Sequence, residues 1–305
     1  MARRRKGRAL DGVLLLDKPK GLSANQALQR ARRLFQAAKA GHTGTLDPMA
    51  TGLLPVCFGE ATKFSAYLLD ADKRYQARVQ LGVATDSGDA EGKEISRADV
   101  PVLDEAAIEA VLADFRGEIE QVPPMYSALK FQGRPLYELA RQGIEIKRTP
   151  RQVTLHNITL LEWDSATQSL VLDVTCSKGT YIRTLAIDIG AAIGCGAHLT
   201  MLKRLQTGPF NSDGMLGLDA LEALEEVARD TQLLPVDVLL EHLPRVQVEI
   251  AFAERLLMGQ KVHADTAAHQ EEEVLRAYEG DRLLGLVTVV KAGVIAPRRL
   301  LRSVL

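Results

Sequence analysis

The amino-acid sequence predicts a large domain of mixed helices and strands, followed by a small all-β domain of about 60 residues. Strict alternation of apolar and polar residues indicates strands, most clearly over 74–82 and 170–176. Apolar residues spaced three and four apart indicate helices over 27–38 and 185–193. Beyond 235–244 the pattern changes to short apolar runs separated by glycines and charges, which favours a separate β domain.

The first elements follow from short local signals. The apolar run 13–16 predicts a strand, and the proline and glycine after it predict a turn. Ser23 and Gln26 fit a capping box at the start of a helix, which we expect to end at Gly41. Residues 41–52, GHTGTLDPMATG, hold three glycines and one proline, so we expect a loop there rather than a regular helix.

The later elements continue both periodicities. Along 74–82 the side chains of Tyr75 and Leu81 share an apolar face, which predicts a half-buried strand. An apolar run over 53–58 follows the loop 41–52. We expect further strands over 170–176, 246–250 and 283–290, helices over 104–115 and 185–193, and an acidic loop over 86–94.

Composition excludes several classes of protein. Hydrophobic residues make up 46% and charged residues 25% of the 305 residues, which suits a folded globular chain rather than a disordered one. No run of 18 uncharged apolar residues exists, so we expect no membrane span. Three cysteines are too few for a disulfide framework and suit a reducing compartment, so we expect a cytoplasmic protein.

The net charge of −1 conceals opposed blocks of charge. Residues 1–40 hold eleven basic and two acidic side chains, whereas 84–120 hold eleven acidic and three basic ones. Residues 211–243 are also acidic, and 121–160 carry a net charge of +4. This pattern excludes a uniformly basic nucleic-acid binder but allows one basic face, and ordinary solvated surface is the alternative. The opening MARRRKGRAL lacks the apolar core of a secretory signal, so we expect residues 1–9 to form a flexible basic arm.

Asp47 is the first candidate for chemistry, because it lies in the loop 41–52 among small side chains that let a partner approach. A carboxylate there can act as nucleophile or general base, or it can simply cap an Asp-Pro turn. His42 in the same loop is an acid–base partner, a stacking group or a structural histidine.

Three further side chains each allow both a structural and a functional interpretation. Tyr75 packs in the core on the simplest interpretation, but its hydroxyl then needs a partner. Lys63 and Arg183 can each neutralise a carboxylate. Arg183 follows Gly179 in the first turn of a helix, where the helix dipole disfavours a cation, so we expect a nearby carboxylate or phosphate to compensate it.

The sequence gives little indication of a metal site or a nucleotide-binding site. Cys195 and His198 have ligand spacing, but the sequence offers no second closely spaced pair, so we expect no metal. The glycine-rich segment lacks the lysine of a phosphate-binding loop, and no dinucleotide-binding fingerprint follows a strand. We therefore expect no cofactor.

Six ordered motifs between about Gly12 and Phe210 closely resemble the bacterial TruB family of tRNA pseudouridine(55) synthases, and GLVTVVKAGVIAPRRLL resembles the family's PUA-type RNA-binding domain. The six motifs are LLLDKPKGLSAN, GHTGTLDPMATGLLPVCFGEATKF, DKRYQARVQLGVATDSGDAEG, VPPMYSALKFQGRPLYELARQG, CSKGTYIRTLAIDIG and GAHLTMLKRLQTGPF. The resemblance implies an α+β fold with a mixed, largely antiparallel sheet and flanking helices. It also implies a catalytic domain over 10–243, a PUA-like domain over 244–305, and a monomer that binds the T-arm stem-loop of tRNA.

The resemblance also implies roles for single residues. Asp47 is expected to be the catalytic aspartate, Arg183 to pair with it and favour its charged form, and Tyr75 to stack on the target uracil and take part in proton transfer. Five further residues are expected to bind the substrate RNA. His42 would help to hold the everted nucleotide, Tyr181 would line the pocket and Leu202 would contact the target base. Lys63 would support the active-site loops, and Lys18 would bind RNA.

Residue chemistry agrees with an isomerase that moves the uracil from its N1–C1′ bond to a C5–C1′ bond without cofactor or water. Whether Asp47 attacks C1′, attacks C6 or removes a proton on a glycal route stays open. An RNA-binding or tRNA-folding factor with a structural Asp47 loop is the alternative of a different class, and a nucleoside-bond hydrolase is a third.

Overall fold

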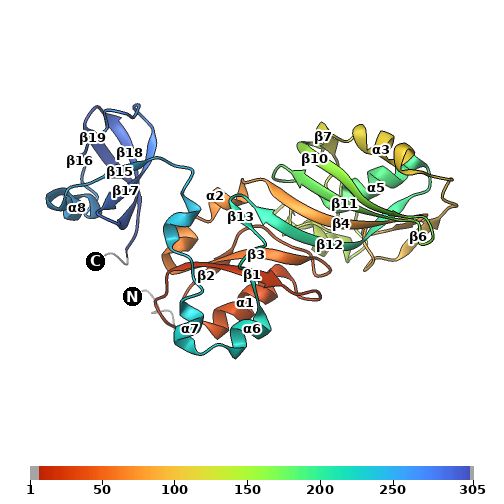
Figure 1. Cartoon of the computed structure of the whole chain (residues 1–305), viewed down its shortest axis with the longest axis horizontal. Coiled ribbons are helices and arrows are strands. Elements are labelled where there is room, and N and C mark those ends of the chain that lie inside the picture. Colours follow the sequence, from red (N-terminus) through yellow and green to blue (C-terminus); the bar gives the residue numbers. More distant parts are fainter. Residues whose placement is uncertain (1–6, 303–305) are drawn as a thin grey trace.

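The computed structural model describes residues 7–302, so most of the predicted arm 1–9 lies outside the described residues. The chain forms an elongated molecule in which one long twisted sheet is followed, at one end, by a smaller sheet (Figure 1). None of the helices in residues 7–302 is long and apolar enough to cross a membrane.

The large sheet is mixed and mostly antiparallel. Its main path runs β14-β1-β3-β12-β4-β11-β10-β7, while β2 pairs with β3 and β13 pairs with β12. Only the β1–β14 and β3–β12 pairs are parallel. The strands are β1 (Gly12–Lys18), β2 (Ala40–His42), β3 (Thr51–Phe58), β4 (Lys73–Leu81), β7 (Gly117–Gln121), β10 (Arg151–Asp164), β11 (Ser169–Cys176), β12 (Ala197–Thr207), β13 (Phe210–Asn211) and β14 (Leu216–Gly217).

Helices cover the large sheet and close its core. The predicted capping box is present, because Ser23 and Gln26 exchange side-chain and backbone hydrogen bonds at the start of α1 (Ala24–Leu34). The predicted end of this helix at Gly41 is wrong: Phe35 caps it, and Gln36 adopts a φ of 50° that turns the chain away. The other helical segments of this part are η1 (Gly59–Lys63), α2 (Ala66–Leu69), α3 (Glu105–Ala113), α5 (Ile182–Ile193), α6 (Leu218–Ala223), α7 (Glu226–Asp230) and η2 (Val236–Leu239).

The smaller sheet has five strands in the order β15-β17-β18-β19-β16 and a hydrophobic core of its own. The prediction of an all-β domain is wrong in one respect, because α8 (Ile250–Leu257) buries Ala253 and Leu256 against this sheet. The strand expected over 246–250 is correspondingly shorter. The strands are β15 (Arg245–Gln247), β16 (Val262–His263), β17 (Val274–Glu279), β18 (Arg282–Lys291) and β19 (Val294–Leu300). The boundary between 243 and 244 stays a prediction.

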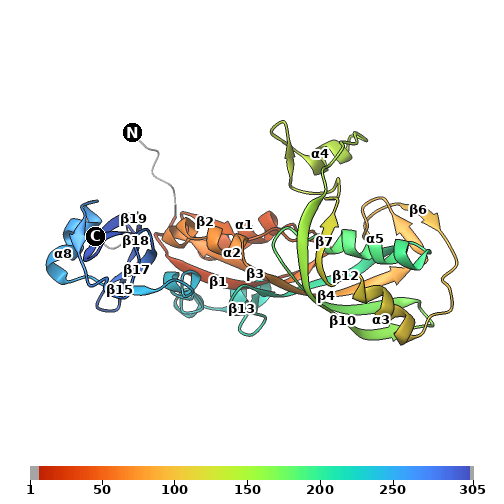
Figure 2. The same ribbon diagram turned by 90° about the horizontal axis from the view of Figure 1, so that it is seen from above.

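Two insertions leave the large sheet. The hairpin β5 (Val83–Thr85) and β6 (Glu94–Arg97) follows β4. The second insertion contains β8 (Lys130–Phe131), β9 (Arg134–Pro135) and α4 (Leu136–Ala140), and it projects from the sheet as a separate arm (Figure 2). The base of this arm lies beside the loop between β2 and β3, which carries Asp47.

Candidate active site

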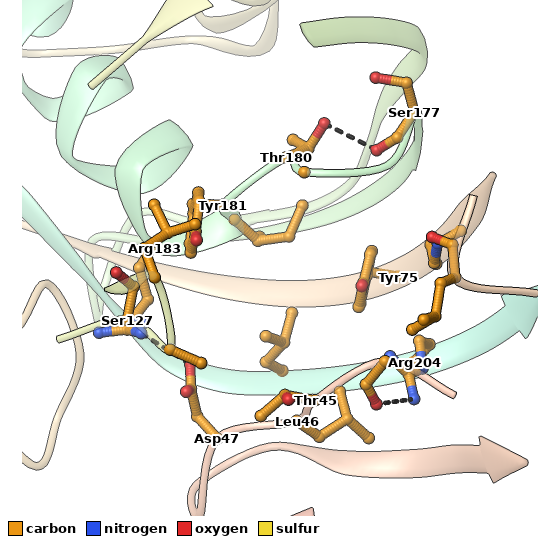
Figure 3. Close-up of a pocket in the computed structure, with 18 residues that line it drawn as sticks. Thr45, Leu46, Asp47, Tyr75, Ser127, Ser177, Thr180, Tyr181, Arg183 and Arg204 are labelled. Atoms are coloured by element: carbon orange, nitrogen blue, oxygen red, sulfur yellow. Dashed lines mark hydrogen bonds and ion pairs between the residues drawn. The ribbon is translucent and has the colours of Figure 1, made fainter. Parts of the chain in front are cut away.

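A cavity of about 340 Å³ lies at the centre of the large sheet. The loop between β2 and β3 forms one wall, β4 and β12 form the floor, and the start of α5 forms the opposite wall (Figure 3). The segment 127–129, at the base of the projecting arm, also borders it. Segments that are far apart in sequence therefore meet around one concave space, which is the usual form of a small-molecule or nucleotide site.

Asp47 lies at the edge of this cavity. Its Oδ2 atom is 2.9 Å from Nη2 of Arg183, and 36% of its side chain remains exposed. The backbone turns at this point, because the amide of Ala50 donates to the carbonyl of Asp47. The backbone at Asp47-Pro48 therefore forms a turn, and the carboxylate of Asp47 remains accessible to a ligand.

Arg183 connects several walls of the site. It lies in the first turn of α5 and is almost completely buried. Its guanidinium donates to the carbonyls of Ser87 at 3.0 Å and Tyr126 at 2.6 Å, besides pairing with Asp47. Asp89 is a second carboxylate beside it, with Oδ2 at 3.7 Å from Nε. The compensating anion expected for a cation at this helix start is thus a pair of carboxylates.

Burial and charge act in opposite directions on Asp47. Burial raises the pKa of Asp47 above its usual value, the nearby Arg183 lowers it, and Asp89 raises it further. The net direction is upward. Arg183 therefore favours the charged form, as expected, but does not outweigh burial.

Two tyrosines and a leucine face the same cavity. Tyr75 on β4 is largely buried and lies opposite Arg204 of β12, while Leu202 lies on β12 near it. Tyr181 precedes α5, and its amide donates to Oε1 of Gln121 at 2.9 Å. Burial raises the pKa of both tyrosines, so both phenols are neutral near pH 7. Their rings give the cavity flat, apolar walls.

His42 lies on the other side of Asp47. It borders a second cavity of about 650 Å³, which shares Asp47, Ser127 and Arg183 with the first. Burial and the nearby Arg204 lower the pKa of His42, so its ring is neutral near pH 7. A stacking or hydrogen-bonding role suits this histidine better than that of a cationic acid.

The structure does not bring two of the predicted residues to either cavity. Lys18 is completely buried, and its ammonium donates to the carbonyls of Leu22 at 2.6 Å and Pro48 at 3.5 Å. Burial lowers the pKa of Lys18 to about 8. We therefore assign Lys18 to holding the Asp47 loop from below rather than to contacting RNA. Lys63 ion-pairs with Glu60 and donates to the carbonyl of Leu300, so it links η1 to the smaller sheet.

Three further residues border the site or its arginine, and the sequence did not predict them. Asp89 lay in the acidic loop, but nothing in its spacing indicated that it faces Arg183. Ser127 borders both cavities from an irregular segment that periodicity cannot place. Arg204 on β12 is 1% exposed, although the two adjacent cations Lys203 and Arg204 give no sign in the sequence of which one is buried.

Comparison with known proteins identifies the family. A protein named tRNA pseudouridine synthase B from Chromohalobacter salexigens is 60% identical over 303 residues, covering 99% of this chain and 98% of the relative. The chain belongs to the TruB family of pseudouridylate synthases. A protein of the same name from Aromatoleum aromaticum is 55% identical over 99% of this chain and 96% of its own length. The family model "TruB family pseudouridylate synthase (N terminal domain)" matches 32–182, and two TruB C-terminal models match 183–241 and 244–301.

Solved structures place the fold in the same group. The crystal structure of a Cbf5-Nop10-Gar1 complex aligns with a TM-score of 0.68 at 29% identity, covering 92% of this chain and 79% of that one. An H/ACA RNP bound to a substrate RNA containing 2′-deoxyuridine aligns with a TM-score of 0.70 at 24% identity, covering 98% and 91%. The expected α+β fold, with a mixed sheet and a PUA-like C-terminal sheet, is confirmed. As a member of the TruB family, the chain is a pseudouridine synthase, which is an isomerase.

Proposed function

We propose that the chain converts uridine 55 in the T loop of tRNA to pseudouridine, with Asp47 as the catalytic carboxylate. The observation that carries the proposal is the accessible carboxylate of Asp47, paired with Arg183, at the edge of a cavity walled by Tyr75, Tyr181 and Leu202. The names of the relatives, tRNA pseudouridine synthase B, support tRNA as the substrate.

The proposed reaction breaks the N1–C1′ bond, rotates the uracil and joins C5 to C1′. C5 gives up its proton when it bonds to C1′, and N1 takes up a proton in its place. Uridine and pseudouridine therefore have the same composition, and the net reaction consumes neither a redox cofactor nor water. Asp47 supplies the charged group that starts the reaction, and Arg183 holds this carboxylate at the cavity edge. The route that follows, whether a covalent bond to C1′ or C6 or a glycal, is left open by the geometry.

The walls of the cavity suit an everted base. Extrusion of a nucleotide costs a few kcal/mol, and stacking on an aromatic side chain returns about 1–3 kcal/mol. Tyr75 and Tyr181 provide such aromatic faces, and Leu202 excludes water beside them. Water exclusion protects an activated C1′ centre from hydrolysis, which separates an isomerase from a hydrolase.

Exposed basic residues on several parts of the chain suit contacts with the RNA backbone. Arg30 and Arg33 are exposed on α1, one helical turn apart. The projecting arm lies within 121–160, a stretch of net charge +4. Arg298 and Arg299 are exposed on β19 of the smaller sheet. Phosphate contacts at these places would supply affinity even though the whole chain has a net charge of −1.

A product assay tests the proposed function. The protein is incubated with a tRNA transcript and, separately, with a transcript in which cytidine replaces uridine 55. The RNA is digested to nucleosides, which are separated by chromatography and identified by mass spectrometry. We expect pseudouridine at position 55 of the first transcript and none in the second. Free uracil would identify a nucleoside-bond hydrolase instead, and tight binding without any product would identify an RNA-binding factor.

The N-terminal cations give a second prediction. Arg8 was expected to belong to the basic arm, but it ion-pairs with Asp230 and Glu226, so it is not free for phosphate. Deletion of residues 1–6, which contain four cations, is expected to weaken tRNA binding and to flatten the slope of log affinity against log salt by up to about 3. Titrations at several salt concentrations measure the slope. An unchanged slope would show that these cations do not neutralise phosphates.

A further inference from the structure

Arg204 is a buried cation that the proposed reaction has not used. It is the largest of the fully buried side chains in the described part of the chain, at 1% exposure, yet it borders the cavity. The acceptors of its hydrogen bonds are the backbone carbonyls of Leu53 and Gly44, and no carboxylate of residues 7–302 forms an ion pair with it. Burying a charge without a carboxylate partner costs free energy, which suggests that the Arg204 side chain has a specific role at this position.

The hydrogen bonds of Arg204 bracket the loop that carries Asp47. Nε donates to the carbonyl of Leu53 at 2.7 Å, and Nη2 donates to the carbonyl of Gly44 at 3.3 Å. One side chain thus holds the chain just before and just after the segment 45–52.

Two glycines allow Arg204 to come so close. A Cβ atom at Gly52 would lie 2.3 Å from the carbonyl oxygen of Arg204, and one at Gly44 would lie 3.3 Å from its Nη1. Both glycines also have positive φ angles, of 94° and 83°. Glycines in the segment 41–52 therefore stand where the Asp47 loop and Arg204 meet.

The same arginine is the neighbour of Tyr75. Arg204 and Tyr75 are directly opposite one another in the antiparallel pairing of β12 with β4, so their side chains share a face of the sheet. Both border the cavity, and Figure 3 shows them on the side away from Arg183. The guanidinium also interacts with the phenol and lowers the pKa of Tyr75 against the effect of burial.

We propose that Arg204 is a positioning residue that fixes the Asp47 loop relative to the ring of Tyr75, so that both meet one uridine. The proposal rests on the proposed function, since it assigns Asp47 and Tyr75 to the same substrate. Arg204 acts through these two groups, because its own hydrogen bonds go to the backbone on either side of Asp47. A purely structural arginine would change stability without changing the chemical step.

The test separates the chemical step from binding and from folding. Single-turnover rates and tRNA affinities are measured for the wild type, Arg204→Lys and Arg204→Met, each at a temperature where thermal melts show a folded protein. We expect Arg204→Met to lower the single-turnover rate about 100-fold, as a misplacement of about 1 Å does, with affinity changed less than about 3-fold. Arg204→Lys, which keeps the charge but not the forked contacts, is expected to fall between Arg204→Met and the wild type.

Arg229→Met is the matched control. Arg229 also donates to three backbone carbonyls, those of Leu34, Leu221 and Leu224, but it borders neither cavity. We expect this control to lower the melting temperature and to leave the single-turnover rate unchanged. An equal loss of rate in Arg229→Met would show that the loss reflects general destabilisation, and would overturn the proposal.

A double-mutant cycle keeps the proposal testable if Arg204→Met does not fold. Because Arg204 is proposed to act partly through Tyr75, the rate loss caused by Arg204→Lys should be smaller in a Tyr75→Phe background than in the wild type. Additive losses, or a wild-type rate in folded Arg204→Lys, would overturn the positioning role. A wild-type protein that forms no pseudouridine would overturn the proposed function and the role of Arg204 with it. If the wild type is active, the variants test the role of Arg204 alone.

Discussion

Asp47→Asn is expected to abolish pseudouridine formation while the affinity for tRNA changes by less than about 3-fold. The amide has nearly the shape of the carboxylate, but it carries no negative charge and cannot act as a nucleophile or base. We expect the single-turnover rate to fall by about 10⁴-fold or more. Affinity is expected to persist because most of the binding energy comes from phosphate and base contacts spread over the RNA.

Asp89→Asn is the matched control for this prediction. Asp89 approaches the same guanidinium, but its carboxylate is held by the hydroxyl of Ser87 at 2.6 Å and the amide of Glu91 at 3.1 Å, and it does not border the first cavity. Its loss should slow the reaction far less than the loss of Asp47. Mass-resolved nucleosides and filter binding on the same samples measure both quantities. Appreciable product from Asp47→Asn would contradict the catalytic role.

The strands and helices with clear periodicity could be predicted from the sequence. β4 alternates between buried side chains and side chains that are at least partly exposed, as expected, and the predicted α3 and α5 are present. The end of α1 could not be predicted, because the apolar stripe continues past the point where Phe35 packs against Phe58 at 4.9 Å between ring centroids. Periodicity reports which face is buried, whereas tertiary packing decides where the helix stops.

The site itself was only partly predictable. Asp47 could be found because proline and glycines mark its loop, and Arg183 because a cation at the start of a helix needs an anion. Lys18 was expected to bind RNA because of the family resemblance alone, whereas the structure places its side chain fully buried under the loop. Arg204 follows Lys203 on β12, and sequence alone does not separate a solvated cation from a buried one there.

Arg183→Met is expected to lower the rate strongly and to change its dependence on pH. The substitution removes the cation between Asp47 and Asp89, and of the cations that lower the pKa of Asp47 only Lys18 then remains among the described residues. Since Arg183 lowers the pKa of Asp47, whereas burial and Asp89 raise it, the loss of Arg183 must raise this pKa further.

The sign of the pH effect follows from the charged form of Asp47. A higher pKa of Asp47 means that a smaller fraction of the carboxyl is ionised at any given pH on the acid side, so the acid limb of the single-turnover rate should move to higher pH. The deficit of Arg183→Met should therefore be largest at low pH and shrink as the pH rises. Arg183→Lys, which keeps the positive charge, should shift the limb much less. An acid limb that stays in place in folded Arg183→Met would show that Arg183 orients the loop without controlling the ionisation of Asp47.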